Sequence, residues 1–134
     1  MNGERKVVGA TGAPAAIGPY SQGIVLPDLG LVFSSGQIGC DPATGRIVEG
    51  GIEAEMARVL DNLEAVLTAA GSGLDCVVRS TLYLIDLGEF DVANRVYAAR
   101  LGAPLPARST VEVSRLPKGA RIEMDLIATV RRAS

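Results

Sequence analysis

The sequence contains no histidine, and this absence limits its chemistry more than any other feature of the composition. Without an imidazole the chain cannot build a Ser-His or Cys-His nucleophile pair, a histidine general base or a histidine-rich metal site. Tryptophan is also absent, and three tyrosines and two phenylalanines supply all the aromatic rings. Any chemistry must therefore be performed by carboxylates, arginines, hydroxyls, backbone groups or a thiol.

A concentrated basic segment and a long apolar run are missing as well. The 13 basic and 15 acidic residues give a net charge of −2, and the basic ones are scattered apart from Arg131 and Arg132. Binding along a phosphate backbone requires clustered positive charge, so we expect no nucleic-acid partner. No stretch approaches the roughly 18 apolar residues of a membrane span, and no apolar region follows the charges at the N-terminus. We therefore expect a cytoplasmic protein that does not bind membranes.

Cysteine is scarce too. Cys40 and Cys76 form neither a C-x-x-C pair nor the cysteine-dense pattern of a secreted disulfide scaffold. We expect both thiols to be reduced and to serve as small core or turn residues.

The length and patterning indicate one folded domain. The chain has 134 residues, of which 48% are hydrophobic and 21% charged, and it shows no repeat, linker or low-complexity tract. Apolar residues recur at helical spacing over 52–70, and Gly71 follows where a left-handed cap would end that helix. A shorter helix is predicted over 87–101, before Pro104. We expect residues 1–134 to form a single domain.

Strands are predicted over 7–8, 21–26, 31–35, 76–85, 108–113 and 122–130. The even positions of 122–130 are all apolar, which leaves Glu123 on the opposite face, and the alternation in 108–113 separates Arg108 from Val111. We therefore expect Arg108 and Glu123 to share a polar face, with their two strands joined through 114–121. The element order favours an α+β fold: a mixed, mostly antiparallel sheet with two helices on one face.

Several segments, in the same order from residue 13 to residue 124, resemble the RidA family of reactive intermediate/imine deaminases, also called the YjgF or L-PSP family. They are Ala13-Pro-Ala-Ala-Ile-Gly-Pro-Tyr-Ser-Gln22, Ser34-Ser-Gly-Gln37, Asp41-Pro-x-Thr-Gly45, Asn62-Leu63, Ala69-Ala-Gly71, Asp86-Leu87, Phe90, Asn94-x-x-Tyr97, Pro106-Ala-Arg-Ser-Thr110, Leu116-Pro-Lys118 and Ile122-Glu-Met124. The combination of Pro-Ala-Arg-Ser with Leu-Pro and Ile-Glu-Met at this spacing is the most specific part of the match.

The resemblance implies a chorismate-mutase-like fold assembled as a homotrimer, with active-site clefts between subunits. It implies hydrolysis of enamines and imines such as 2-aminoacrylate, 2-iminopropanoate and 2-iminobutanoate to 2-oxo acids and ammonia. The implied partners are these small 2-imino acids and further copies of the chain. The implied activity uses no cofactor and no metal.

The resemblance also assigns roles to seven residues. Arg108 takes the position that anchors the substrate carboxylate, for which a guanidinium offers two parallel donors, and Glu123 the position that orients the attacking water. The predicted substrate-binding residues are Tyr20, Ser35, Gly36, Asn94 and Thr110. Thr110 stands where many relatives carry cysteine, which disfavours a covalent thiol mechanism at that position. Many relatives also have an aromatic residue near the pocket where this chain has Ala98-Ala-Arg-Leu101.

Other interpretations remain open from the residues alone. Arg108 could form an ion pair with Glu112 or Glu123, Glu123 could be an exposed strand residue, and Asn94 could make a structural hydrogen bond. Tyr20 could cap the loop before it, and Ser35 could be a buried strand hydroxyl. At the level of function, the alternatives are a non-enzymatic small-molecule-binding or holdase-like protein using the same clefts, and an endoribonuclease. The acidic pI of about 5.1 and the missing histidine count against the ribonuclease.

Overall fold

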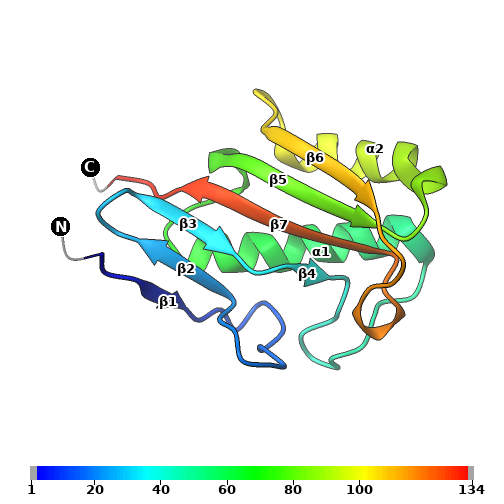
Figure 1. The fold of residues 1–134 in the computed structure, drawn as a ribbon, viewed down its shortest axis with the longest axis horizontal. Helices are drawn as coiled ribbons and strands as arrows, with labels where there is room; N and C mark the ends of the chain where they lie inside the picture. Colours follow the sequence, from blue (N-terminus) through cyan, green and yellow to red (C-terminus); the bar gives the residue numbers. More distant parts are fainter. Residues whose placement is uncertain (1–2, 133–134) are drawn as a thin grey trace.

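Seven strands form one mixed sheet in the computed structural model, which describes residues 3–132 (Figure 1). The strand order is β1-β2-β3-β7-β5-β6, and β4 pairs with β7 beside this path. The strands are β1 (Lys6–Val8), β2 (Gly23–Leu26), β3 (Leu31–Ser34), β4 (Gln37–Ile38), β5 (Val77–Leu84), β6 (Ala107–Glu112) and β7 (Ile122–Thr129). Only β5 and β6 pair in parallel, so the predicted α+β fold with a mostly antiparallel sheet is confirmed.

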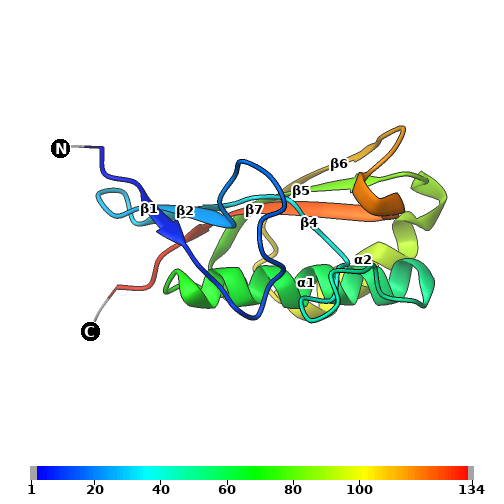
Figure 2. The same cartoon turned by 90° about the horizontal axis from the view of Figure 1, so that it is seen from below.

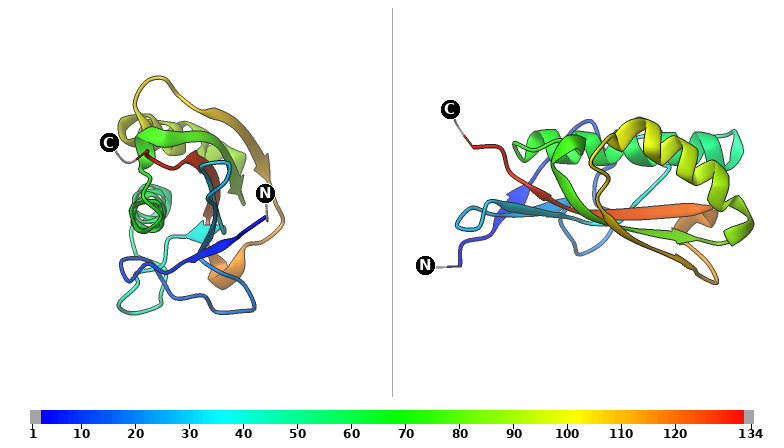
Figure 3. Two further views of the ribbon diagram at one scale, coloured as in Figure 1. Left: turned by 90° about the vertical axis from the view of Figure 1, so that its left-hand side faces the viewer. Right: turned by 90° about the horizontal axis from the view of Figure 1, so that it is seen from above.

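The two helices, α1 (Gly51–Ala69) and α2 (Phe90–Leu101), cover the same face of the sheet (Figures 2 and 3). Gly71 adopts a positive φ of 79° just beyond the end of α1, as the sequence predicted, because this cap conformation favours glycine. The predicted second helix divides at its start: Leu87–Glu89 forms a 3₁₀ turn, and the Asp86 carboxylate accepts a hydrogen bond from the backbone of Gly88 at 2.8 Å. Neither helix in residues 3–132 is long and apolar enough to cross a membrane.

The core lies between this helix layer and the sheet. Along β7 the even-numbered side chains are buried and the odd-numbered ones are more exposed, as the alternation in the sequence predicted. Their partners on α1 recur at three- and four-residue spacing, which buries one stripe of that helix. The fully buried large side chains are Val32, Met56, Val59, Leu60, Leu63, Val66, Leu67, Leu82, Leu84, Ile122, Met124 and Leu126.

The position of β6 differs from the one expected. The connection 114–121 does not join neighbouring strands, because β5 lies between β6 and β7 and pairs with both. The chain reaches β6 from β5 through α2, and a helical crossover of this kind returns the next strand parallel to the first. The sequence patterns do not separate this arrangement from a hairpin, because both leave β6 and β7 with one apolar face.

Buried Asn62 of α1 fixes the segment that follows β4, a short strand that the sequence did not predict. Its amide donates to the backbone carbonyls of Ile38 at 3.2 Å and Cys40 at 2.9 Å, and its carbonyl accepts from Arg58 at 3.0 Å. Because Asn62 is completely buried, removing its side chain leaves the buried Cys40 carbonyl without a donor, whereas the Ile38 carbonyl keeps the hydrogen bond from the Cys40 backbone at 2.8 Å.

Asn62→Ala is therefore expected to lower the free energy of unfolding by about 1–3 kcal/mol. Chemical denaturation followed by circular dichroism measures this change. The neighbouring Asp61→Ala is the control, because the Asp61 carboxylate is 47% exposed in its ion pair with Arg100 and its loss costs about 1 kcal/mol or less. Equal destabilisation by the two variants would contradict the structural role assigned to Asn62.

Candidate functional site

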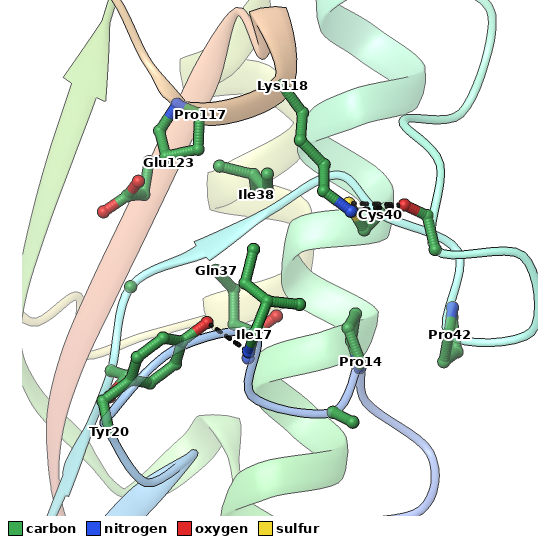
Figure 4. A pocket seen from close by; sticks show the side chains of 14 residues that line it. Pro14, Ile17, Tyr20, Gln37, Ile38, Cys40, Pro42, Pro117, Lys118 and Glu123 are labelled. Atoms are coloured by element: carbon green, nitrogen blue, oxygen red, sulfur yellow. Dashed lines mark hydrogen bonds between the residues drawn. The ribbon is translucent and has the colours of Figure 1, made fainter.

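A cavity of about 450 Å³ opens where the loop before β2, the β3–β4 junction and the turn before β7 meet (Figure 4). Its lining residues are Pro14, Ala15, Ile17, Tyr20, Ser35, Gly36, Gln37, Ile38, Cys40, Pro42, Gly45, Pro117, Lys118 and Glu123. Of the seven predicted site residues, the structure brings four to this cavity: Tyr20, Ser35, Gly36 and Glu123. The volume lies in the range of small-molecule sites.

Among residues 3–132, Glu123 supplies the only carboxylate in the cavity wall. It lies on β7 opposite Ile38 of β4 and Tyr83 of β5, on the sheet face that the helices leave open. Burial raises the pKa of its carboxyl group above the ordinary value, and the negative charge of Asp125 on the same strand raises it further. Within residues 3–132 no hydrogen bond or ion pair engages this carboxylate, so it is free to accept one from a bound molecule or water.

Gly36 makes room for the Glu123 carboxylate. A Cβ atom at position 36 would lie 2.8 Å from Glu123 Cδ and closer still to one carboxylate oxygen, whereas the glycine hydrogen leaves that space open. Residues 34–36 interrupt the pairing of this part of the chain with β7. Before them, Phe33 of β3 lies opposite Ile127, and after them Gln37 of β4 lies opposite Met124. The bulge between β3 and β4 thus brings the backbone of Gly36 against the carboxylate.

Tyr20 and Ser35 line the cavity and also stabilise the surrounding loops. The Tyr20 hydroxyl accepts a hydrogen bond from the backbone of Ile17 at 3.2 Å, which leaves its proton available to a ligand. The Ser35 hydroxyl donates to the carbonyl of Ser21 at 2.5 Å, so only its lone pairs remain for a ligand. The loop-capping interpretation of Tyr20 therefore holds alongside its position in the cavity, and Ser35 likewise has a structural hydrogen bond.

Arg108 is not on the face of the sheet where the sequence placed it. It lies opposite Ser80 in the pairing of β6 with β5, and the Ser80 hydroxyl is hydrogen bonded to Tyr97 of α2 at 2.7 Å. Arg108 therefore projects toward the helices, whereas Glu123 projects from the open face. The expected shared polar face is wrong, because side-chain direction on β6 depends on its register with β5, which the alternation alone does not reveal.

The Arg108 guanidinium is held by three side chains of α2. One terminal nitrogen of the guanidinium donates to the Asn94 side-chain carbonyl at 2.7 Å. The Cζ atom of Arg108 lies 5.5 Å from the ring centroid of Phe90 and 4.8 Å from that of Tyr97. The bond to Asn94 is its only hydrogen bond within the described residues, so most of its five N–H donors remain available. It pairs with neither Glu112 nor Glu123. Asn94 therefore holds this arginine.

Thr110 lies two residues beyond Arg108 on the same face of β6 and is half-buried. Like Arg108 and Asn94, it is not part of the cavity that holds Glu123. The predicted site residues thus fall into two groups within one chain: one lines the cavity with Glu123, and the other surrounds Arg108 on the opposite face of the sheet.

Several residues that line the cavity or contact Arg108 were not assigned a functional role from the sequence. Phe90 and Tyr97 were recognised as the inner face of a helix, and their spacing of seven residues, with Asn94 between them, is the signal that they share a face. Lys118 was noted only within its Leu-Pro-Lys motif. Cys40 lines the cavity, but burial raises the pKa of its thiol, which keeps it protonated. Within residues 3–132 no three acidic or cysteine side chains lie together in a way that could hold a metal ion.

Asp125→Asn is expected to shift the pH dependence of any reaction in which Glu123 acts as a base. Because the Asp125 charge raises the pKa of Glu123, the neutral amide lowers that pKa, and the acidic limb of the pH–rate profile moves to lower pH. Asparagine retains an oxygen that can accept the hydrogen bond from the Tyr83 hydroxyl, which is 2.9 Å in length. Steady-state rates measured across pH test this, with Asp28→Asn, in the exposed β2–β3 turn, as the control. An unchanged acidic limb would exclude this coupling.

Comparison with known proteins identifies the class to which this fold and cavity belong. Residues 10–130 match the family described as Endoribonuclease L-PSP. The 2-iminobutanoate/2-iminopropanoate deaminase of Mus musculus is 42% identical over 124 residues, which cover 92% of this chain and 90% of the relative.

Solved structures of similar fold lead to the same family. RidA from the Antarctic bacterium Psychrobacter sp. PAMC 21119 superposes with a TM-score of 0.89 at 39% identity, covering 93% of this chain and 99% of that structure. TdcF of E. coli, solved with bound serine, gives a TM-score of 0.87 at 36% identity and covers 94% and 99% of the two chains. The chain described here belongs to the RidA family, also called the L-PSP family, as its sequence motifs indicated.

Proposed function

We propose that this protein is a hydrolytic deaminase of 2-imino acids and their enamine tautomers. The substrates are 2-aminoacrylate, 2-iminopropanoate and 2-iminobutanoate, and the products are 2-oxo acids and ammonia. The observation that carries the proposal is the Glu123 carboxylate, half-buried without a partner among the described residues and adjoining the bare backbone of Gly36. The names of relatives at about 40% identity, such as the mouse deaminase, support the same reaction class.

The chemistry requires little more than a positioned water. A protonated imine carbon is already electrophilic, so Glu123 accepts a proton from water while the water oxygen bonds to that carbon. The resulting carbinolamine collapses: Glu123 returns its proton to the nitrogen, the C–N bond breaks to release ammonia, and the hydroxyl oxygen gives its proton to the ammonia as it becomes the new carbonyl. Tyr20 can donate a hydrogen bond to the substrate or the water. No cofactor or metal is needed at any step.

Arg108 is proposed to anchor the substrate carboxylate, and Asn94 and the rings of Phe90 and Tyr97 keep its guanidinium oriented. The planar group presents parallel N–H donors that match two carboxylate oxygens. Because Arg108 and Glu123 lie on opposite faces of the sheet within one chain, a site that uses both must combine two chains. Thr110 is proposed to contribute only to the wall beside Arg108.

The assembly we propose is a homotrimer in which each cleft takes Glu123 from one subunit and Arg108 from its neighbour. The open face of the sheet supports an assembly: Phe33 is 37% exposed and Val111 is 42% exposed on that face. A sheet buries an apolar face against another layer, and within residues 3–132 no helix covers this one. Subunits packed on the open faces would bury these side chains.

An endoribonuclease activity, which the family description names, is not the activity we propose. Cleavage of RNA calls for a basic surface to bind the phosphates, and the acidic pI of about 5.1 gives no such excess of positive charge. The absence of histidine also removes the usual acid–base residue for such cleavage.

The direct test supplies the imine in situ. A threonine or serine dehydratase releases the unstable intermediate, and the rate of 2-oxo acid formation is followed with and without the purified protein. We expect the protein to increase this rate severalfold at catalytic concentration, and Arg5→Ala, an exposed residue that does not line the cavity, to behave like the wild type. The absence of acceleration over buffer would overturn the proposal. Ligand binding that persists after loss of both Arg108 and Glu123 would instead favour a non-enzymatic binding protein.

A further inference from the structure

Lys118 is the only cationic side chain that the described part of the chain places in the wall of the cavity, and the proposed reaction gives it no role. It lies in the turn Pro117–Gly119 before β7, with a positive φ of 57° that is uncommon for a residue other than glycine. Its ammonium group donates to the carbonyl of Gly45 at 2.7 Å, which joins this turn to the turn that follows Cys40. This contact holds one positive charge at a fixed place in the cavity wall.

The cavity extends well beyond the reacting end. Figure 4 shows the Glu123 carboxylate and the Lys118 ammonium group apart, with Ile38 between them in this view. The part near Lys118 is lined by Cys40 and Pro42, so the walls there are mainly apolar. A volume of about 450 Å³ exceeds what a four-carbon imino acid fills and leaves space for a longer side chain.

We propose that the Lys118 end of the cavity is a subsite for the substrate side chain and that it accepts 2-imino acids whose aliphatic chain ends in a carboxylate. This inference rests on the proposed deaminase function. With Arg108 assigned to the 2-imino acid carboxylate, a second fixed cation suits a second anionic group. One of the three donors of the ammonium group is used by Gly45, and two remain for the terminal carboxylate.

The apolar wall between the two ends matches the methylene groups of such a substrate. Burial raises the pKa of the Cys40 thiol, so this side chain adds no negative charge beside the subsite. A short substrate such as 2-iminopropanoate does not reach Lys118 and is expected to be indifferent to it.

The test compares three imines, generated by amino acid oxidases from alanine, norleucine and glutamate. Disappearance of each imine is followed by competition with semicarbazide. For the wild type we expect kcat/KM for the glutamate-derived imine to equal or exceed that for the neutral norleucine-derived one. Lys118→Gln, which keeps a hydrogen-bond donor without the charge, should lower that ratio about tenfold. Lys118→Arg should preserve it, and neither variant should change the rate with the alanine-derived imine.

The outcomes separate the two proposals. If the alanine-derived imine is hydrolysed but the glutamate-derived imine is not, the subsite is excluded and the deaminase function stands. The same holds if Lys118→Gln lowers all three rates equally, since this would indicate only a looser turn. If no imine is hydrolysed, both proposals fall. Equal denaturation midpoints for the three proteins confirm that the variants are folded.

Discussion

Two inactive variants, Arg108→Ala and Glu123→Gln, should recover activity when their subunits are assembled together. Each variant alone lacks one of the two functional residues in every cleft. Truncation of Arg108 forfeits two charge-assisted hydrogen bonds to the substrate carboxylate, about 3–6 kcal/mol together, which lowers kcat/KM on the order of 10²-fold or more. Glu123→Gln keeps the size and shape of the side chain but removes the base. We expect a comparable loss of kcat/KM.

In a mixed assembly some clefts regain both residues. If each site takes Glu123 from one chain and Arg108 from the next, random mixing of the two variants restores about a quarter of the clefts. The variants are unfolded, mixed in equal amounts and refolded together, and the deaminase rate is compared with that of each variant refolded alone. A mixture as inactive as its components would refute the two-chain site.

Arg108→Lys separates charge from geometry in the same assay. Lysine keeps the positive charge and much of the aliphatic contact with Phe90 and Tyr97 but cannot present two parallel donors. We expect activity between that of the wild type and that of Arg108→Ala. Full activity in the lysine variant would show that a fixed charge suffices and that the guanidinium fork is not required.

Gly36→Ala should abolish most of the activity without unfolding the protein. The new methyl group would occupy the position of the Glu123 carboxylate, with a Cβ only 2.8 Å from Glu123 Cδ. The backbone of Gly36 does not have a positive φ, so alanine is tolerated there and the flexible glutamate side chain must move instead. A misplacement of about 1 Å at the reacting group costs roughly 10²-fold in rate.

The matched control is Gly9→Ala. A Cβ atom at position 9 would have no heavy atom within 4 Å, and Gly9 has no positive φ, so this substitution adds the same methyl group without a clash. We expect wild-type activity in Gly9→Ala and equal thermal midpoints in both variants. Activity in Gly36→Ala close to that of the wild type would show that the position of the Glu123 carboxylate does not limit the reaction.

The local features of the fold could be predicted from the sequence because they depend on spacing within one segment. The three- and four-residue recurrence of α1 and the alternation along β7 record which side of each element is buried, and Gly71 records where α1 ends. The motifs around Arg108 and Glu123 likewise identified the family, and the family model and relatives confirm it.

Features that depend on contacts between distant segments could not be predicted in this way. The insertion of β5 between β6 and β7 sets the register of Ser80 with Arg108, and this register turns the arginine toward α2. The carbonyl of Gly45 and the amine of Lys118 meet across 73 positions of sequence, and no periodic pattern records such a contact.

The absence of histidine had already restricted the chemistry to carboxylates, arginines and hydroxyls, and the motifs then singled out Glu123 and Arg108 among them. Only the tertiary structure showed that these two residues face away from each other in one chain. The physical reason is that sequence determines which residues alternate along a strand, whereas the partner strand decides which face of the sheet each of them occupies.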